Sequence, residues 1–267
     1  MPDRSDAHHA VWLSGEFIAA EGRGELSIAY QPIVELATSR VVGAEALLRW
    51  THATRGAVSP NIFIGFAEPE GLLSGPGAFA LQTALDDLAS WREVSRAARG
   101  LFVSVNVSPT QLDSPGLVAD LKQAIDDRGM DLQDLHLELT ETAPPPGPGA
   151  ARALQALHSH GFHIAIDDFG TGYSSLLRVQ NLPCDSLKID RAFTAGLPDD
   201  IACKAIVASS LALAHGLSLG TVAEGIETAE QRNHLLQAGC DMGQGYLFGR
   251  PVDATTFRAM YLDRSIK

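Results

Sequence analysis

Short runs rich in β-branched and aromatic residues recur along the chain, and longer segments between them repeat apolar residues every three to four positions. The short runs predict strands, whereas the longer segments predict helices. Strands are expected at 27–36, 40–50, 101–108, 135–141, 163–170, 186–190, 218–227 and 243–251. Helices are expected at 77–97, 113–128, 149–160, 198–215, 228–238 and 253–262.

Strands that alternate with helices predict a mostly parallel sheet covered by helices, and eight such units in about 250 residues favour a closed barrel. The first two strands depart from this pattern because only the segment ATSR separates them, which is too short for a parallel crossover. The expected fold class is therefore α/β, a modified (β/α)8 barrel of the TIM type with an antiparallel first strand. Residues 1–25 are expected to form an N-terminal lead-in with a helix, and residues 26–267 a single barrel domain.

The charge balance restricts the possible partners. The chain has 32 acidic and 20 basic residues, a net charge of −12, which disfavours duplex nucleic acid as a ligand. A small phosphate ester remains possible if metal ions mask the acidic groups. No apolar stretch of membrane-spanning length and no signal-peptide pattern is found, so we expect a cytoplasmic protein without a membrane partner.

The alternation of side chains along the predicted strands indicates where chemistry takes place. Valines at 103, 105 and 107 share one face of their strand, and leucines at 135, 137 and 139 share one face of the next, so polar residues take the other face. Active sites of such barrels lie at the carboxyl ends of the strands. Six strands are expected to deliver inward polar groups there, namely Glu45, Asn106, Glu138, Asp167, Lys188 and Glu224.

Crowded carboxylates imply bound cations. Five of them are expected at this mouth: Glu45, Glu138, Asp167, Asp168 and Glu224. They cannot all stay ionised in a poorly solvated site without opposing charge. Oxygen ligands with one amide, from Asn106, suit Mg²⁺ or Mn²⁺ and disfavour a structural zinc site. The adjacent Asp167 and Asp168 would point to opposite sides of an ideal strand, so we expect the strand to end there.

Taken singly, these features have simpler explanations. A lone Glu45 on a strand is typical of a surface or rim carboxylate. The Asp167-Asp168 pair before Phe-Gly is typical of a turn or helix cap, and Lys188 could extend from a strand end into solvent. Their order along the chain and their shared parity favour one common site.

At these residues the sequence resembles the EAL phosphodiesterase family, named after the tripeptide found here as Glu45-Ala46-Leu47. The resemblance covers nearly the whole chain. It includes YQPIV at 30–34, SPNIFIGFAE at 59–68, VSVNVS at 103–108, LELTE at 137–141, DDFGTGYSSL at 167–176, LKIDR at 187–191, AEGIET at 223–228 and QGYLFGRP at 244–251.

The resemblance implies an enzyme that hydrolyses cyclic di-GMP to linear pGpG with two divalent cations, Mg²⁺ or Mn²⁺. The implied ligands of one ion are Glu45, Asn106, Glu138 and Asp167, and those of the other are Asp167, Asp168 and Glu224. The implied catalytic residues are Glu45, Asp167, Lys188 and Glu224, with Lys188 contacting the attacking water. The implied substrate-binding residues are Gln31, Leu47, Arg49, Asp190, Glu227 and Gln244.

Glu141 is expected to act differently, because it lies three positions beyond Glu138 and has the opposite parity. By resemblance it anchors the loop at 168–176, which lies near the surface through which family members form homodimers. Two alternatives to the enzyme remain. One is a cyclic di-GMP receptor of the same fold with little turnover, and the other is an interaction protein that uses the barrel only as a surface.

Overall fold

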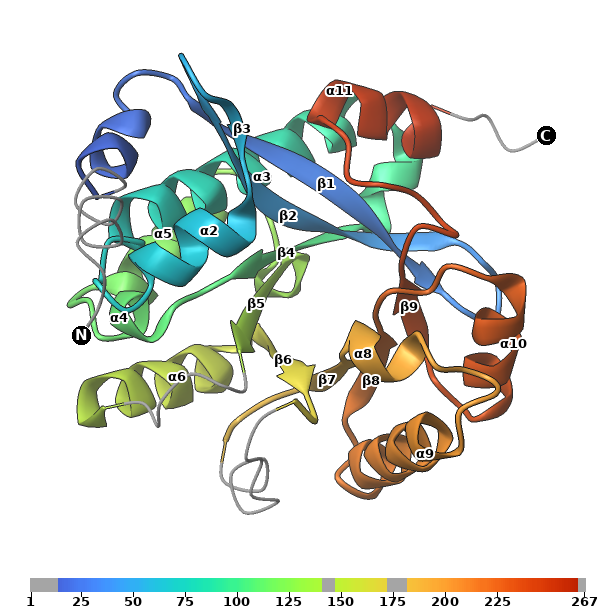
Figure 1. Cartoon of the computed structure of the whole chain (residues 1–267). Coiled ribbons are helices and arrows are strands. Elements are labelled where there is room, and N and C mark those ends of the chain that lie inside the picture. Colours follow the sequence, from blue (N-terminus) through green and yellow to red (C-terminus); the bar gives the residue numbers. More distant parts are fainter. Residues whose placement is uncertain (1–13, 141–146, 172–181, 264–267) are drawn as a thin grey trace, which may run out of the picture.

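The computed structural model of the chain describes residues 14–140, 147–171 and 182–263 (Figure 1). Within them, strands β1, β2, β4, β5, β6, β7, β8 and β9 pair in that order, and β9 pairs again with β1, which closes a barrel. Their bounds are Leu26–Glu35, Val41–His52, Phe102–Asn106, Leu135–Thr140, His163–Phe169, Ser186–Ile189, Gly220–Ala223 and Met242–Gln244. The predicted barrel is thereby confirmed.

The first strand runs against its neighbours. β1 is antiparallel to both β2 and β9, whereas every pair from β2–β4 round to β8–β9 is parallel. The antiparallel first strand predicted from the short connection is therefore confirmed. Beyond the barrel, the end of β2 folds back on the short strand β3, Gly56–Val58, which the sequence pattern did not predict.

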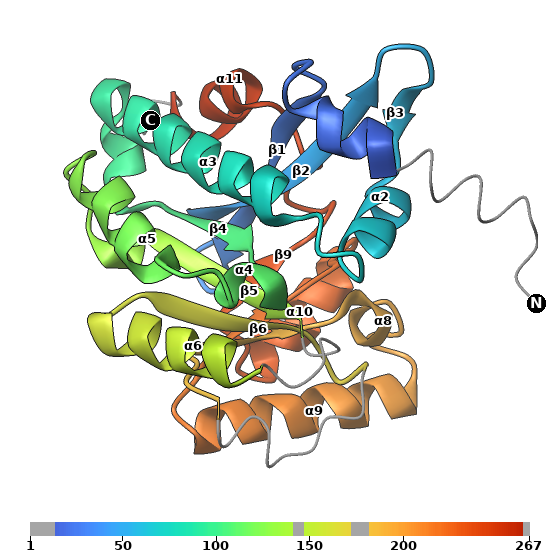
Figure 2. The same cartoon turned by 90° about the vertical axis from the view of Figure 1, so that its left-hand side faces the viewer.

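Helices cover the outside of the barrel (Figures 1 and 2). The described α-helices are α2 Pro60–Ala67, α3 Ser74–Val94, α4 Pro109–Leu112, α5 Leu117–Asp126, α6 Pro148–His160, α8 Arg191–Thr194, α9 Ile201–Gly216, α10 Ala229–Gln237 and α11 Ala254–Phe257. Short turns of other helical types lie at Arg96–Gly100, Leu132–Asp134 and Arg258–Leu262. Residues 14–20 are also helical, while residues 1–13 of the predicted lead-in lie outside the described residues.

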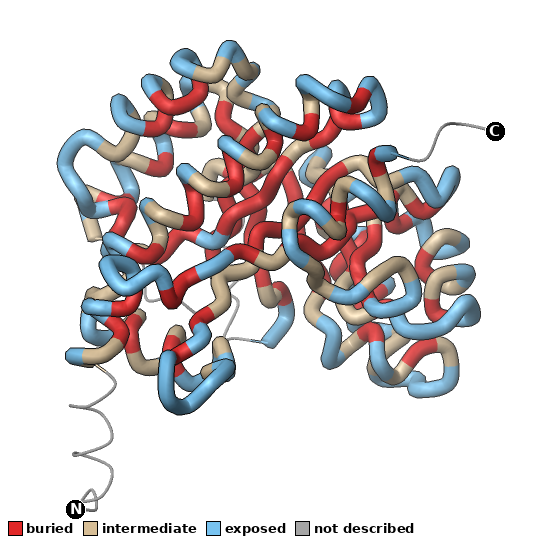
Figure 3. The backbone as a smooth tube through the Cα atoms, turned by 90° about the horizontal axis from the view of Figure 1, so that it is seen from above, coloured by how far each residue is buried: buried red, intermediate tan, exposed pale blue. Residues whose placement is uncertain are grey.

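The apolar core lies between the strands and these helices. Outward-facing strand residues such as Val103, Leu137 and Ile164 are fully buried and pack against helix residues such as Leu85 and Leu157. The tube coloured by burial shows buried segments in the interior and exposed segments on the outer faces of the helices (Figure 3). The apolar side chains on one face of each strand are buried in this layer. The polar side chains on the other face therefore point into the barrel interior.

Two predicted strands are much shorter than expected. β8 ends at Ala223 and β9 at Gln244, where residues up to 227 and 251 were expected to be extended. The backbones beyond these ends bond to each other instead, because the Ile226 N–H donates to the Gln244 carbonyl at 3.0 Å and the Leu247 N–H to the Ile226 carbonyl at 3.0 Å. The two segments thus leave the ladder and shape the rim of the barrel mouth. Helix α2 was also missed, although Pro60 at its first turn is a helix-start signal.

None of the helices in the described ranges is long and apolar enough to cross a bilayer.

Candidate active site

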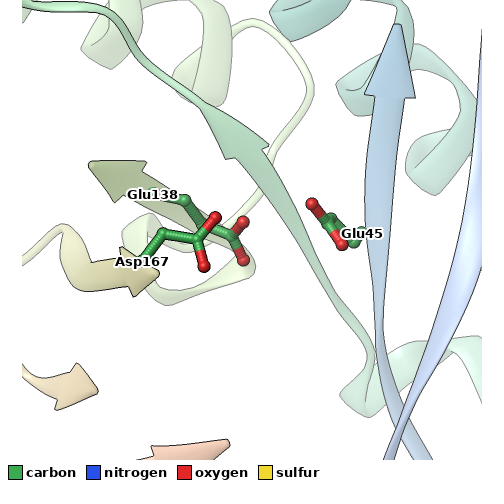
Figure 4. Close-up of side chains that lie close together, drawn as sticks. All are labelled: Glu45, Glu138 and Asp167. Atoms are coloured by element: carbon green, nitrogen blue, oxygen red, sulfur yellow. The ribbon is translucent and has the colours of Figure 1, made fainter. Parts of the chain in front are cut away.

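The polar side chains predicted to face inward meet at the carboxyl ends of the barrel strands. Glu138 on β5 and Asp167 on β6 point toward the side of the barrel from which Glu45 on β2 projects (Figure 4). Lys188 lies between them on β7 with only 1% of its surface exposed, and Glu138 has 2%. The structure brings these residues into one cluster.

The carboxylates form two groups that share one residue. In each group the oxygen atoms lie within 4.8 Å of one another, and the groups are Glu45 with Glu138 and Asp167, and Asp167 with Asp168 and Glu224. Both consist only of hard oxygen donors, which are the ligands that Mg²⁺ and Mn²⁺ prefer. This donor set therefore fits two divalent ions, with Asp167 able to contact both.

Lys188 supplies the positive charge inside the cluster. Its Nζ is surrounded by four carboxylates, at 2.6 Å from Glu224, 2.7 Å from Glu138, 3.2 Å from Asp167 and 3.9 Å from Glu45. Burial by itself lowers the pKa of this lysine, but the surrounding carboxylates outweigh burial and raise the pKa well above its usual value. The ammonium group is therefore held charged in a nearly solvent-free position.

One ammonium group does not balance so many carboxylates. Burial, together with Asp167 and Glu45, raises the pKa of Glu224 to about 8 despite the opposing effect of Lys188. Burial and the neighbouring Asp167 raise the pKa of Asp168 to about 6. The pKa of the fully buried Glu138 is likewise raised well above its usual value, chiefly by burial. Additional positive charge at this position would relieve the crowding, and the expectation of bound cations rests on the same physics.

The backbone at Asp168 corrects one expectation. β6 does not end at the aspartate pair but continues to Phe169, and its pairing with β7 shifts register between Ile166 and Phe169. Asp168 has φ +56°, in the left-handed region, so the strand is bulged there. The bulge turns the side chains of Asp167 and Asp168 toward the same mouth although they are neighbours in sequence.

Two amide side chains hold the Glu45 carboxylate. Asn106 donates to its Oε1 at 3.2 Å, and Gln244 donates to its Oε2. Gln244 also donates to the Gln31 side-chain oxygen at 3.0 Å. Gln31 and Glu45 lie opposite each other in the β1–β2 pairing, so the antiparallel hairpin sets the position of this network.

A cavity of about 490 Å³ opens above the cluster. Of the predicted substrate-binding residues it is lined by Gln31, Leu47, Asp190, Glu227 and Gln244. Arg49 lines a second cavity of about 220 Å³, which shares Leu47, Asp167 and Asp168 with the first. Burial lowers the pKa of Arg49, opposed by Glu45 and Tyr246, and the guanidinium donates to the Leu48 carbonyl at 3.0 Å.

Sequence reasoning left several wall residues of the larger cavity unassigned. They are Asn61, Arg191, Gly225, Gly245 and Tyr246. Asn61 and Tyr246 belong to the motifs SPNIFIGFAE and QGYLFGRP quoted above. These motifs could have identified them as wall residues, whereas the alternation of side chains along the strands could not. Asp190 has a second task, because its carboxylate accepts the Ala192 N–H at 2.8 Å and caps α8.

The predicted loop anchor cannot be placed in the same way. Glu141 and residues 172–176 of the loop it was expected to hold lie outside the described residues. The described part of that loop contains Gly170, with φ +98°, where the turn requires the left-handed region.

Comparisons with known proteins identify the family of the chain. The family model described as EAL domain matches residues 16–251. The chain is 38% identical over 251 residues to the bifunctional diguanylate cyclase/cyclic di-GMP phosphodiesterase MucR of Pseudomonas aeruginosa, covering 94% of this chain and 36% of that protein. It is 43% identical over 231 residues to an uncharacterized protein of Azorhizobium caulinodans, covering 85% and 31%. The chain thus spans about a third of the length of these relatives.

Solved structures give the same result. The EAL enzyme Bd1971 in its cAMP-bound form superposes with a TM-score of 0.90 at 35% identity, covering 96% of this chain and 71% of that one. The MucR phosphodiesterase in complex with c-di-GMP superposes with a TM-score of 0.84 at 37% identity, covering 92% and 99%. With its barrel, its acidic mouth and the family match over residues 16–251, the chain belongs to the EAL domain family.

Proposed function

We propose that this chain hydrolyses one phosphodiester bond of cyclic di-GMP to give linear pGpG, using two divalent cations at the carboxyl mouth of the barrel. The observation that carries the proposal is the pair of carboxylate groups that share Asp167 and enclose Lys188. Solved relatives with c-di-GMP bound, such as the MucR phosphodiesterase, support the choice of substrate.

The proposed ligands of the first ion are Glu45, Asn106, Glu138 and Asp167, and those of the second are Asp167, Asp168 and Glu224. When bound, two such ions lower the pKa of an attacking water and offset the negative charge that develops on the phosphoryl oxygens. In the reaction, the water oxygen forms a bond to phosphorus while the bond from phosphorus to the 3′ oxygen breaks. The 3′ oxygen leaves as a hydroxyl group, so the product carries a 5′ phosphate.

The protein groups contribute by position and charge. The Lys188 ammonium is held among carboxylates in a nearly water-free position, where it can stabilise negative charge on the attacking oxygen and on the phosphoryl group. The amides of Asn106 and Gln244 fix the Glu45 carboxylate, so this side chain needs little rearrangement during the reaction. Arg49 is proposed to bind a phosphate from the adjoining cavity.

The test is direct. Purified protein is incubated with cyclic di-GMP and Mg²⁺ or Mn²⁺, with and without EDTA, and products are separated by chromatography. We expect pGpG to appear with metal and to be absent with excess chelator. Full turnover in EDTA would contradict the two-metal proposal, and binding of cyclic di-GMP without any product would favour a receptor instead.

A further inference from the structure

One aromatic ring stands at the rim of the 490 Å³ cavity. Tyr246 lines this cavity with 50% of its surface exposed. Among the described residues that line the cavity it is the only aromatic one, and the remaining wall is mostly polar and acidic. A single exposed aromatic residue needs no explanation by itself. Three further observations indicate that the ring contacts a ligand. It lies on the cavity wall, its backbone is held by hydrogen bonds, and a cationic side chain lies beside it.

The backbone holds Tyr246 in a rigid turn. The Leu247 N–H donates to the Ile226 carbonyl at 3.0 Å, and the Gly249 N–H donates to the Gly245 carbonyl at 3.1 Å, so the turn is bonded within itself and to the neighbouring loop. A Cβ atom on Gly245 would lie 2.1 Å from the Ile226 carbonyl oxygen, so only glycine permits this close approach. The ring therefore projects from a fixed base, which reduces the entropy lost when a ligand packs against it.

A cation covers part of the ring. The Arg250 Cζ lies 4.0 Å from the centre of the Tyr246 ring, which is a cation–π contact. This contact orients the ring and adds positive charge next to a strongly acidic cavity. A flat ligand in the cavity can then use the ring as a wall while the carboxylate cluster and its ions face the phosphodiester.

We propose that Tyr246 is a stacking residue for one purine base of the substrate, oriented by Arg250. This inference rests on the proposed function for the identity of the dinucleotide. A base offers a flat aromatic face that matches the ring, whereas the sugar and phosphate match the polar wall and the acidic cluster better. Every base has such a face, so the residue contributes affinity for purines without distinguishing guanine from adenine.

The test uses equilibrium binding with Tyr246→Leu, which keeps apolar bulk but removes the aromatic face, and Tyr246→Phe, which keeps the ring. Dissociation constants are measured for cyclic di-GMP in Ca²⁺ over times at which no product is detected. We expect Tyr246→Leu to weaken binding by about 5- to 100-fold and Tyr246→Phe by less than about 3-fold. The factor for Tyr246→Leu is expected to be similar for cyclic di-AMP, because stacking does not depend on the identity of the base.

Leu247→Ala is the matched control. Leu247 is the next residue of the same turn with 38% of its surface exposed, and it does not line the cavity. Its backbone bond to Ile226 is retained in the variant, so binding is expected to stay within about 2-fold of wild type. A second readout is specific to stacking. A cyclic dinucleotide that carries one 2-aminopurine is expected to fluoresce more strongly when fully bound to Tyr246→Leu than when fully bound to wild type.

The outcomes separate this inference from the proposed function. Binding and 2-aminopurine fluorescence that are unchanged in Tyr246→Leu would overturn stacking, even if the protein hydrolyses cyclic di-GMP. Binding that is lost equally in Leu247→Ala would also overturn it, because the turn and not the ring would then be responsible. Weakened binding with brighter fluorescence supports stacking even if wild type forms no product, in which case only the hydrolysis fails. A wild-type protein that neither binds nor cleaves the dinucleotide overturns both.

Discussion

The two ends of the barrel interior differ in the groups that surround their buried polar side chains. His136 and Glu138 lie two residues apart on β5 and face the same interior, the first toward the amino end of the strand and the second toward its carboxyl end. Burial disfavours the charged form of both, and it lowers the pKa of His136 to about 2 while raising that of Glu138. The groups around each side chain determine whether charge is excluded from that end of the barrel or concentrated there.

At the amino end the neighbours of His136 are rings. Its ring centre lies 3.7 Å from that of Phe102 on one side and 3.7 Å from that of His163 on the other. His163 in turn contacts the Ser186 hydroxyl at 3.0 Å. Gly43 completes this layer, because a Cβ there would lie 2.4 Å from the Phe102 ring. Burial lowers the pKa of both imidazoles, so this end of the interior keeps them neutral.

At the carboxyl end the neighbours of Glu138 are charges, with Lys188 at 2.7 Å and further carboxylates beyond it. A layer that concentrates charge costs stability and is retained where chemistry needs it. The difference agrees with the general division of these barrels, in which the carboxyl face carries function and the amino face carries stability. Four experiments test this division, and they follow in order of expected effect.

Asp167→Asn is expected to abolish hydrolysis, by at least about 1,000-fold, because it removes the carboxylate shared by both groups. Glu45→Ala should have a similar effect. Product formation from cyclic di-GMP in Mn²⁺ is measured by chromatography, with circular dichroism to check folding. Glu93→Gln is the control, since Glu93 is exposed on α3 and should leave turnover unchanged. Activity of Asp167→Asn within tenfold of wild type would remove the shared carboxylate from the mechanism.

Lys188→Met is expected to lower kcat by about 100- to 1,000-fold while changing the affinity for cyclic di-GMP in the presence of metal by only a few fold. The ammonium group stabilises charge that develops during the reaction, so its loss should affect turnover more than binding. Single-turnover kinetics and equilibrium binding give the two quantities. Near-normal kcat would show that this buried cation has only a structural role.

Ca²⁺ in place of Mg²⁺ or Mn²⁺ is expected to lower turnover by about tenfold or more. Ca²⁺ prefers longer bonds and more ligands than the compact carboxylate groups offer. Initial rates are compared at saturating concentrations of each ion, after the ion-free protein has been prepared with EDTA. Equal rates in all three ions would contradict a site that requires short, regular coordination.

His136→Phe is expected to make the protein less sensitive to acid. In wild type the folded-state pKa of His136 is about 2, whereas an unfolded histidine has a pKa of about 6.5. Below pH 6.5 the unfolded state therefore binds a proton that the folded state does not, and the free energy of unfolding falls by about 1.4 kcal/mol per pH unit on this account. The stability that the neutral His136 imidazole contributes is fully present above pH 6.5 and is lost progressively below it. The variant has no such pH dependence, because it has no imidazole at this position.

Urea unfolding at pH 7 and pH 5 measures the effect. The loss of stability between the two pH values should be smaller in His136→Phe by about 2 kcal/mol, while hydrolysis at pH 7.5 stays close to wild type. His160→Phe is the matched control, because His160 is exposed at the end of α6 and lies outside the ring layer. An equal loss in wild type and His136→Phe would show that the ring layer does not exclude the charged imidazole.

Much of this division was visible in the sequence. The alternation in 135–141 predicted both the strand and the inward position of Glu138, because a two-residue period and one buried face leave little freedom. The same alternation placed His136 inward but did not predict its contacts. The stack with Phe102 and His163 joins residues from three strands, so it depends on the register between those strands, which no single segment encodes.

The rim of the mouth was predicted less well. Residues 224–227 and 245–251 have strand-like composition, yet they leave the ladder because each finds hydrogen-bond partners in the other. The position of Tyr246 follows from the hydrogen bonds between these two segments. The bulge at Asp168 has the same origin, since a shift in the pairing of β6 with β7 turns two neighbouring carboxylates to one side.

By itself the sequence determined the barrel, the antiparallel first strand and the set of inward polar residues, because these follow from local periodicity and the length of connections. The tertiary structure alone decided the distances among the carboxylates, the enclosure of Lys188 and the shifts in pKa. Those quantities depend on groups from different strands and on the exclusion of water between them, and electrostatic energies change steeply with both.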